Sequence, residues 1–122
     1  MYVDENKNGE YFDSYGRAPQ EHFANFLRKN TVKYKWNTRQ IQGVTTSTCG
    51  QYSVYFLIAR CRDRSILSHF EDKNFDFNDQ LVVKFVNSYF NTNTKVIDLK
   101  PFLGNARQMC RCEKDCSFCF KL

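Results

Sequence analysis

The chain has few of the residues that separate or link domains. It contains only two prolines and five glycines, and no repeat or Pro- or Gly-rich linker divides its 122 residues. Its longest apolar run, 54–59, is far too short to span a bilayer. Residues 1–10 are polar and acidic, unlike a secretory leader. We therefore expect one domain with no membrane partner and an intracellular location, in the nucleus or the cytoplasm.

Histidine is also scarce, whereas cysteine is not. The chain has two histidines, His22 and His69, and six cysteines. In a chain without a leader, cysteines indicate free thiols, a metal site or catalysis before disulfides. The net charge of +5 is compatible with a polyanionic partner such as nucleic acid, but it is also common in proteins that bind no anion. The aromatic content of 16% is enough to fill a core.

Hydrophobic periodicity predicts an α+β fold with a small antiparallel or mixed sheet. The alternation of Val32, Tyr34 and Trp36 with lysines predicts a strand with one buried face. We expect the sheet to pack on a central helix that starts at Cys49. The expected elements are a hairpin over 1–14 with its turn over 6–9, a helix over 19–30, an extended stretch over 31–42, a buried helix over 49–62 and a helix over 78–90 with Asn78 as its N-cap.

The segment 40–52 is the most informative, because it places Cys49 at the expected start of the buried helix. A helix N-terminus presents unpaired N–H groups and a partial positive charge, which favour a thiolate over a thiol. Gln42 can supply a side-chain N–H beside the backbone N–H of Cys49, and two such donors form an oxyanion hole for acyl transfer. Gly43 and Gly50 leave room for a substrate backbone.

The pattern Gln-Gly-x5-Cys-Gly over residues 42–50 resembles that of adenain-type cysteine proteases. These are the endopeptidases of adenoviruses and of adenovirus-like transposable elements, and they carry a glutamine seven residues before the nucleophile. The aromatic and aliphatic helix over 52–59 is similar as well. The segment 11–16, Tyr-Phe-Asp-Ser-Tyr-Gly, resembles the family's strand that ends in an acidic residue and an aromatic-Gly turn. The resemblance covers about residues 2–90.

This resemblance implies a papain-like fold of the ubiquitin-like-protease type and cysteine endopeptidase activity. It makes Cys49 the nucleophile that forms a thioester, and Gln42 part of the oxyanion hole. It makes Asp13 the acid that orients the catalytic histidine. The implied partner is a protein or peptide substrate, such as a virion precursor, and DNA is a further candidate partner, as in the viral family. No small-molecule cofactor is implied.

The chain departs from the family pattern at two positions. The family histidine precedes the acid, so its position falls a few residues before Met1, and we expect the N-terminal part of the domain to be missing. His22 and His69 do not match that position. The viral enzymes also bind a peptide activator through a cysteine, and Thr31 occupies the matching position here. A disulfide-linked activator is therefore not expected.

Several other interpretations stay open. Ubiquitin-like-protein proteases share the order His, Asp, Gln, Cys, but their Gln-to-Cys spacing is one residue shorter and Asp usually stands where this chain has Thr48. A catalytically inactive, domesticated protease fold that binds protein or DNA is a second alternative. Taken singly, Cys49 could be an ordinary buried cysteine, Gln42 a surface residue and Asp13 a turn cap.

The last residues of the chain form a separate, basic and cysteine-rich segment. We expect the domain to span 1–103 and this tail to span 104–122. Four thiolates could bind zinc, but the spacing C-x-C-x3-C-x2-C is tighter than that of most zinc sites, so an extension without metal is the preferred interpretation. The four cysteines are Cys110, Cys112, Cys116 and Cys119.

Overall fold

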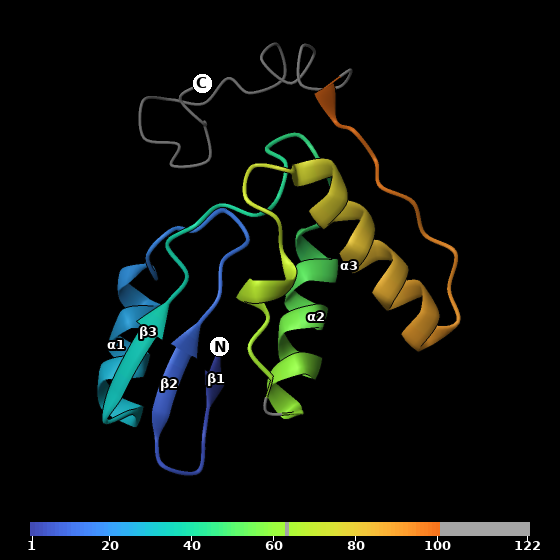
Figure 1. The fold of residues 1–122 in the computed structure, drawn as a ribbon. Helices are drawn as coiled ribbons and strands as arrows, with labels where there is room; N and C mark the ends of the chain where they lie inside the picture. The colour runs from blue at the N-terminus through green and yellow to red at the C-terminus, as the bar shows by residue number, and fades with distance from the viewer. Residues whose placement is uncertain (63, 101–122) are drawn as a thin grey trace.

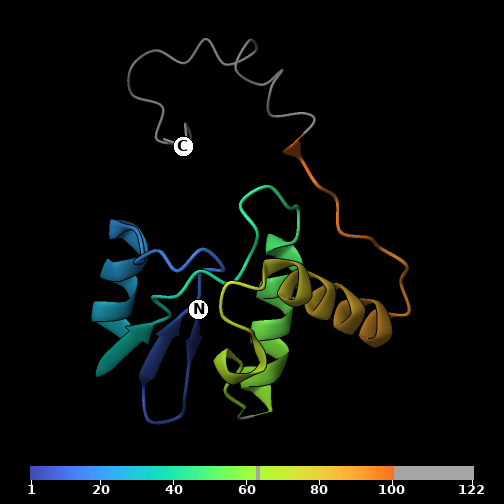
Figure 2. The same cartoon turned by 45° about the horizontal axis from the view of Figure 1, so that its top comes forward.

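The computed structural model describes residues 1–62 and 64–100, so the cysteine-rich tail lies outside the described residues (Figure 1). The sheet lies between α1 on one side and the pair α2 and α3 on the other (Figures 1 and 2). None of the described helices is both long and apolar enough to cross a membrane. The elements in chain order are β1 (Tyr2–Val3), β2 (Asn8–Tyr11), α1 (Glu21–Asn30), β3 (Lys33–Trp36), α2 (Cys49–Cys61), the 3-10 helix η1 (Leu67–His69) and α3 (Phe75–Phe90).

The expected α+β class is confirmed, and the sheet is mixed. Its three strands lie in the order β1-β2-β3. β1 is antiparallel to β2, whereas β2 and β3 are parallel, with Gly9 opposite Tyr34. Parallel neighbours need a crossover connection, and α1 supplies it between β2 and β3.

The first hairpin forms as expected, but its turn spans 4–7 rather than 6–9, with Lys7 N donating to Asp4 O at 3.0 Å. The turn comes earlier, where the carboxylate of Asp4 accepts hydrogen bonds from the backbone N–H of Asn8 at 2.6 Å and from its side-chain amide at 2.8 Å. Gly9 belongs to β2 instead. A Cβ on Gly9 would lie 2.8 Å from Thr31 Cγ2 and 2.9 Å from Tyr34 Cβ, so close packing requires the glycine here.

The buried face expected for the third strand is only partly present. Tyr34 is half-buried, but Val32 is 79% exposed and Trp36 is 38% exposed. β3 is a short strand at the edge of a three-stranded sheet, so few residues are available to cover it. Alternation of apolar and polar residues predicted the strand correctly but overestimated how much of its face the fold buries.

The core lies around α2, which begins at Cys49 as expected. The ring of Tyr55 meets that of Phe85 on α3 edge-on, with centroids 4.7 Å apart. The ring of Phe12, which follows β2, stacks on Phe56 at 4.9 Å and joins the sheet side to the helices. Burial of such a side chain stabilises the fold by roughly 1.5–3 kcal/mol. The buried core residues are Ile41, Tyr52, Tyr55, Phe56, Ala59, Ile66, Phe70 and Val82.

The expected N-cap of the last helix is wrong. α3 starts three residues before Asn78, and Asn74 is the N-cap, since its side chain accepts a hydrogen bond from Phe77 N at 3.2 Å. Asn78 is instead fully buried within the helix. Its amide donates to the carbonyl oxygens of Ile41 at 3.1 Å and Glu71 at 2.9 Å. Asn78 therefore ties α3 to the segment that leads to Gln42.

Candidate functional site

The candidate nucleophile lies at an exposed helix start. Cys49 is the first residue of α2 and its side chain is exposed, so the interpretation as an ordinary buried cysteine is wrong. Gly50 is exposed too, and a Cβ placed on it would have no neighbour within 4 Å. The thiol and the adjacent backbone are thus open to a ligand that approaches from solvent.

Gln42 is fully buried and holds the loop that leads to Cys49, so it is not a surface residue. Its Oε1 accepts a hydrogen bond from the Ser14 hydroxyl at 2.6 Å. Its Nε2 donates to the carbonyl oxygen of Thr46 at 2.9 Å and makes a longer contact of 3.5 Å with Thr46 Oγ1. The amide proposed for the oxyanion hole is therefore directed mainly at its own loop in this structure.

Gly43 is explained by packing without any substrate. A Cβ on Gly43 would lie 3.1 Å from Asp79 Oδ2 and 3.3 Å from Thr46 Cγ2. The carbonyl oxygen of Gly43 accepts a hydrogen bond from the Thr46 hydroxyl at 3.0 Å, which closes a tight turn. The two candidate substrate-binding glycines thus differ, since Gly43 faces α3 and Gly50 faces open space.

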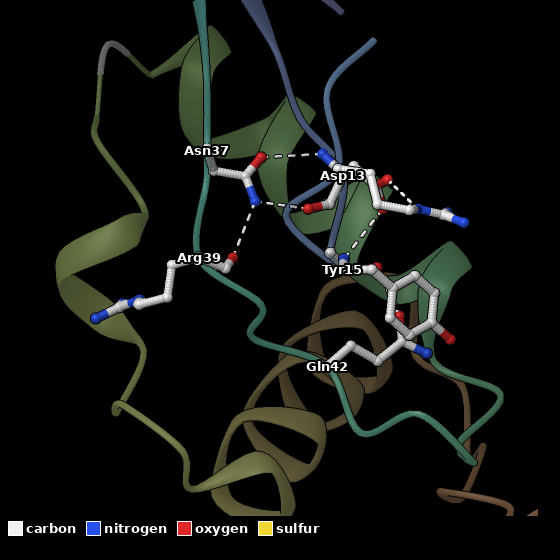
Figure 3. Close-up of polar contacts among 7 residues, drawn as sticks. Asp13, Tyr15, Asn37, Arg39 and Gln42 are labelled. Atoms are coloured by element: carbon white, nitrogen blue, oxygen red, sulfur yellow. Dashed lines mark hydrogen bonds and ion pairs between the residues drawn. The ribbon is translucent and has the colours of Figure 1, made fainter. Parts of the chain in front are cut away.

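Asp13 follows β2 and caps its own turn (Figure 3). Its Oδ1 accepts a hydrogen bond from the backbone N–H of Tyr15 at 3.0 Å, and its Oδ2 pairs with Arg17 Nε at 2.6 Å. Asn37, directly after β3, fixes the turn, because its side chain accepts from Asp13 N at 3.0 Å and donates to Asp13 O at 2.5 Å. The carboxylate is therefore engaged by a backbone amide and a guanidinium.

Tyr15, in the turn of Asp13, is close enough to Cys49 to be influenced by it electrostatically. Burial raises the pKa of the Tyr15 hydroxyl, and the electrostatic influence of Cys49 raises it further, while the positive charge of Arg17 opposes the shift. The turn is also joined to the nucleophile loop through Ser14, whose carbonyl oxygen accepts from the backbone N–H of Gln42 at 3.2 Å. The structure thus brings the three residues of the sequence motif, Asp13, Gln42 and Cys49, into one region.

A buried polar network behind Cys49 escaped the sequence analysis. Asp79 on α3 is 1% exposed, and its Oδ1 accepts from the hydroxyls of Thr48 at 3.0 Å and Tyr52 at 2.8 Å. Burial and the hydrogen bond to Asp79 raise the pKa of Tyr52 far above its usual value. The sequence contains a signal for this burial, because Asp79 lies on the apolar side of its helix. It precedes Val82 by three residues, Val83 by four and Val86 by seven, which places all four on one face.

Neither histidine lies at the candidate nucleophile. The Nδ1 atom of His69 is 2.7 Å from the hydroxyl of Tyr55, which is six residues or about 9 Å along α2 from Cys49. His22 is on α1, where its ring contacts that of Phe23, and α1 lies across the sheet from α2 (Figure 1). Residues 1–62 and 64–100 contain no group of three or more His, Cys, Asp or Glu side chains that could hold a metal ion.

Two surface hollows lie away from the motif residues. One, of about 450 Å³, is bordered by Tyr2, Glu10 and Lys35 of the sheet and by Arg60 of α2. The other, of about 730 Å³, lies between α3 and the segment 92–96. Cys49, Gln42 and Asp13 border neither hollow, so neither provides a substrate cleft for the thiol.

Comparisons with known proteins add no evidence on the function of this site. Neither protein-family models, nor curated proteins, nor solved structures give a match to this chain. The resemblance to adenain-type proteases therefore stays a prediction that rests on the residues of segments 11–16 and 40–52. The fold supports the α+β class and is compatible with a papain-like arrangement.

Proposed function

We propose that this chain belongs to a cysteine endopeptidase of the adenain type, with a papain-like fold and with Cys49 as its nucleophile. The observation that carries the proposal is the exposed thiol at the first residue of α2. Gln42 stands seven residues earlier, at the start of a loop that hydrogen bonds hold in place. A thiol at a helix start is a common arrangement for a reactive cysteine.

In this proposal the Cys49 thiolate attacks a peptide carbonyl, a C–S bond forms and the amine leaves, which gives a thioester that water hydrolyses. The backbone N–H of Cys49 stabilises the oxyanion. The second donor is the Gln42 amide, which in this structure donates to Thr46 and has to turn from that contact to reach the oxyanion. Both donors act on charge that develops in the transition state, so they accelerate the chemical step.

The reaction also needs a group that takes the thiol proton and protonates the leaving amine. In the family pattern this group is a histidine on the strand before Asp13, and the proposal requires one in the natural protein. Arg17 now pairs with Asp13, but the Arg17 side chain is 59% exposed, and exposed ion pairs contribute only about 0.2–1 kcal/mol. An imidazole can therefore displace Arg17 from the carboxylate at small cost.

A second candidate is a catalytically inactive protease fold that binds protein or DNA. The observation that favours it is that Asp13 and Gln42 both have partners within the chain, Arg17 and Thr46. In an inactive module these contacts would be permanent parts of the fold, and the surroundings of Cys49 would not bind peptides selectively.

Labelling of Cys49 by a peptide probe separates the two candidates. Cys61, at the other end of α2, is also an exposed thiol and serves as the internal control. We expect a vinyl sulfone on a peptide that ends in Gly to label Cys49 selectively. The selectivity of each reagent is its ratio of Cys49 labelling to Cys61 labelling. The selectivity of the peptide probe should exceed that of iodoacetamide by more than about tenfold, because a peptide site aligns the probe with the thiol. Equal selectivity of the two reagents would favour the inactive module.

A matched pair of glutamine variants tests the oxyanion donor. Gln42→Glu removes the amide hydrogens, and we expect peptide labelling of Cys49 to slow by about 100-fold, as for loss of an oxyanion-hole donor. Gln80→Glu makes the same chemical change at an exposed position of α3 and should leave the rate unchanged. Preferential reaction with a probe on a whole ubiquitin-like protein would instead support the ubiquitin-like-protein protease alternative.

A further inference from the structure

A buried carboxylate lies directly beneath the start of α2. Asp79 belongs to α3, yet its Oδ1 is bound by Thr48, the N-cap of α2, and by Tyr52 in the first turn of α2. Its Oδ2 has no hydrogen-bond partner among the described residues and faces Gly43. A buried carboxylate is costly unless hydrogen bonds compensate it, so these two hydroxyl donors are firmly held.

The contact with Asp79 changes how α2 begins. A threonine N-cap normally has an extended backbone and accepts a hydrogen bond from the second or third N–H of its helix. Thr48 does neither, because its φ is −98° and its ψ is 4°, and its side chain makes no capping hydrogen bond. Its hydroxyl donates to Asp79 and lies 3.2 Å from the hydroxyl of Thr46. The first helical bond runs from Tyr52 N to Thr48 O at 3.1 Å.

We propose that Asp79 is a positioning residue that draws the Thr48 hydroxyl inward and so keeps the N-terminal N–H groups of α2 uncapped. A hydroxyl that capped the helix would lie over the N–H groups of Gly50 and Gln51, beside Cys49. That is the place where the carbonyl oxygen of a substrate must lie if Cys49 attacks it. The functional part of the inference rests on the proposed peptidase function, whereas the capping part does not.

The energetics favour this arrangement over ordinary capping. The two contacts compete for the position of the Thr48 side chain, because a hydroxyl that donates to Asp79 is held away from the helix N–H groups from which it would accept. The bond to the carboxylate is the stronger of the two, so the inward position is favoured. A negative charge near a helix N-terminus is favourable in itself. The N-terminus of α2 loses one capping hydrogen bond and keeps backbone N–H groups without a cap beside an exposed thiol.

Amide hydrogen exchange in the full chain tests the capping part. With Asp79→Leu the hydroxyl of Thr48 is released and can cap, so exchange at Gly50 or Gln51 should slow by about fivefold, the usual value of a capping bond. The double variant Thr48→Ala with Asp79→Leu has no hydroxyl to cap with, and its exchange should return to the original rate. Asp76→Leu, at an exposed acid in the first turn of α3, is the control and should have no effect.

Each outcome of this experiment decides the proposal. Simple damage to the core by Asp79→Leu would accelerate exchange along α2, and acceleration or no change would overturn the inference. If Asp79→Leu fails to fold, Thr48→Ala decides through exchange at Gly50 and Gln51 relative to the later residues of α2. Loss of the hydroxyl bond to Asp79 accelerates exchange along the whole helix to the same extent, as expected if Thr48 does not cap, whereas loss of a cap accelerates Gly50 and Gln51 selectively and would overturn the inference.

The peptide probe tests the functional part in the same proteins. Labelling of Cys49 should slow in Asp79→Leu and recover in the double variant, a rescue that structural damage cannot produce. If exchange follows the prediction but the probe shows no preference for Cys49 in any form, the capping role of Asp79 stands and the peptidase function fails. If labelling is selective but unaffected by Asp79→Leu, the function stands and the role of Asp79 in it fails.

Discussion

The hydroxyl of Tyr52 offers the sharpest test of the buried network beneath α2. Tyr52 is fully buried, and Tyr52→Phe keeps its ring in the core while it removes the donor that lies 2.8 Å from Asp79 Oδ1. The same hydroxyl lies 3.0 Å from Ile41 O, but that oxygen keeps the amide of Asn78 at 3.1 Å as a donor. The loss therefore falls on the carboxylate, which retains only the Thr48 hydroxyl.

A hydrogen bond to a charged group contributes about 1.5–3 kcal/mol, so we expect Tyr52→Phe to lower the free energy of unfolding by about 2 kcal/mol. At roughly 4 °C per kcal/mol for a chain of this length, the Tm should fall by about 8 °C. Urea and thermal unfolding at pH 7 measure both quantities. Tyr89→Phe, at a half-exposed ring on α3, is the matched control and should stay within about 0.5 kcal/mol of the original protein.

The result that refutes this reasoning is a Tyr52→Phe variant as stable as the Tyr89→Phe control. It would mean that the hydroxyl of Tyr52 does not hold a buried carboxylate, and the proposed diversion of Thr48 by Asp79 would lose its support. A double variant with Asp79→Leu refines the test, because it leaves no buried carboxylate without its donor and should cost less than the sum of the single changes.

Two further predictions concern alkaline pH and the glycines. The folded chain keeps Tyr52 protonated because its pKa is raised, while the unfolded chain loses that proton near pH 10. This stabilisation is therefore complete below pH 10 and is lost above it, by up to about 1.4 kcal/mol per pH unit. In urea unfolding between pH 9 and 11.5, Tyr52→Phe should reduce the fall of the free energy of unfolding with pH by that amount. Gly16 has a φ of +73°, and a Cβ on it would lie 2.7 Å from the backbone carbonyl carbon of Arg39, so Gly16→Ala should destabilise the fold by about 2 kcal/mol or more. Gly50→Ala, on a helix with open space around it, should stabilise the fold by about 0.4–1 kcal/mol. Equal effects of the two substitutions in thermal unfolding would contradict these different roles of the glycines.

The sequence was sufficient where a single local pattern decided the structure. The buried helix begins at Cys49 because small hydroxyl-bearing residues precede a run of core aromatics, and both signals are local. Local signals misplaced the first turn, since Asp4 and Gly9 both suit turns and only the packing of Gly9 against Thr31 and Tyr34 assigns it to a strand. Asn74 and Asn78 are equally good N-caps by residue type, and the burial of Asn78 distinguishes them.

The motif residues of the site could be chosen from the sequence, but their contacts could not. Spacing singled out Gln42 and Cys49 as candidates and the resemblance of segment 11–16 added Asp13, and the structure brings the three into one region around Tyr15 and Ser14. The direction of the Gln42 amide toward Thr46 depends on the loop conformation. The network through Asp79 depends on how α3 packs against α2, and its partner Thr48 is 31 residues away in the sequence, beyond the reach of any periodic pattern.

Selective capture of a peptide by Cys49 is the most direct test of the proposed peptidase function. The measurement compares, by mass spectrometry of digested protein, the labelling of Cys49 and Cys61 by the Gly-terminated vinyl sulfone in the folded and the urea-unfolded chain. We expect a clear preference of the probe for Cys49 in the folded chain, beyond that of iodoacetamide, and loss of this preference in urea. The same preference in both states, or none in either, would contradict a peptidase site at Cys49.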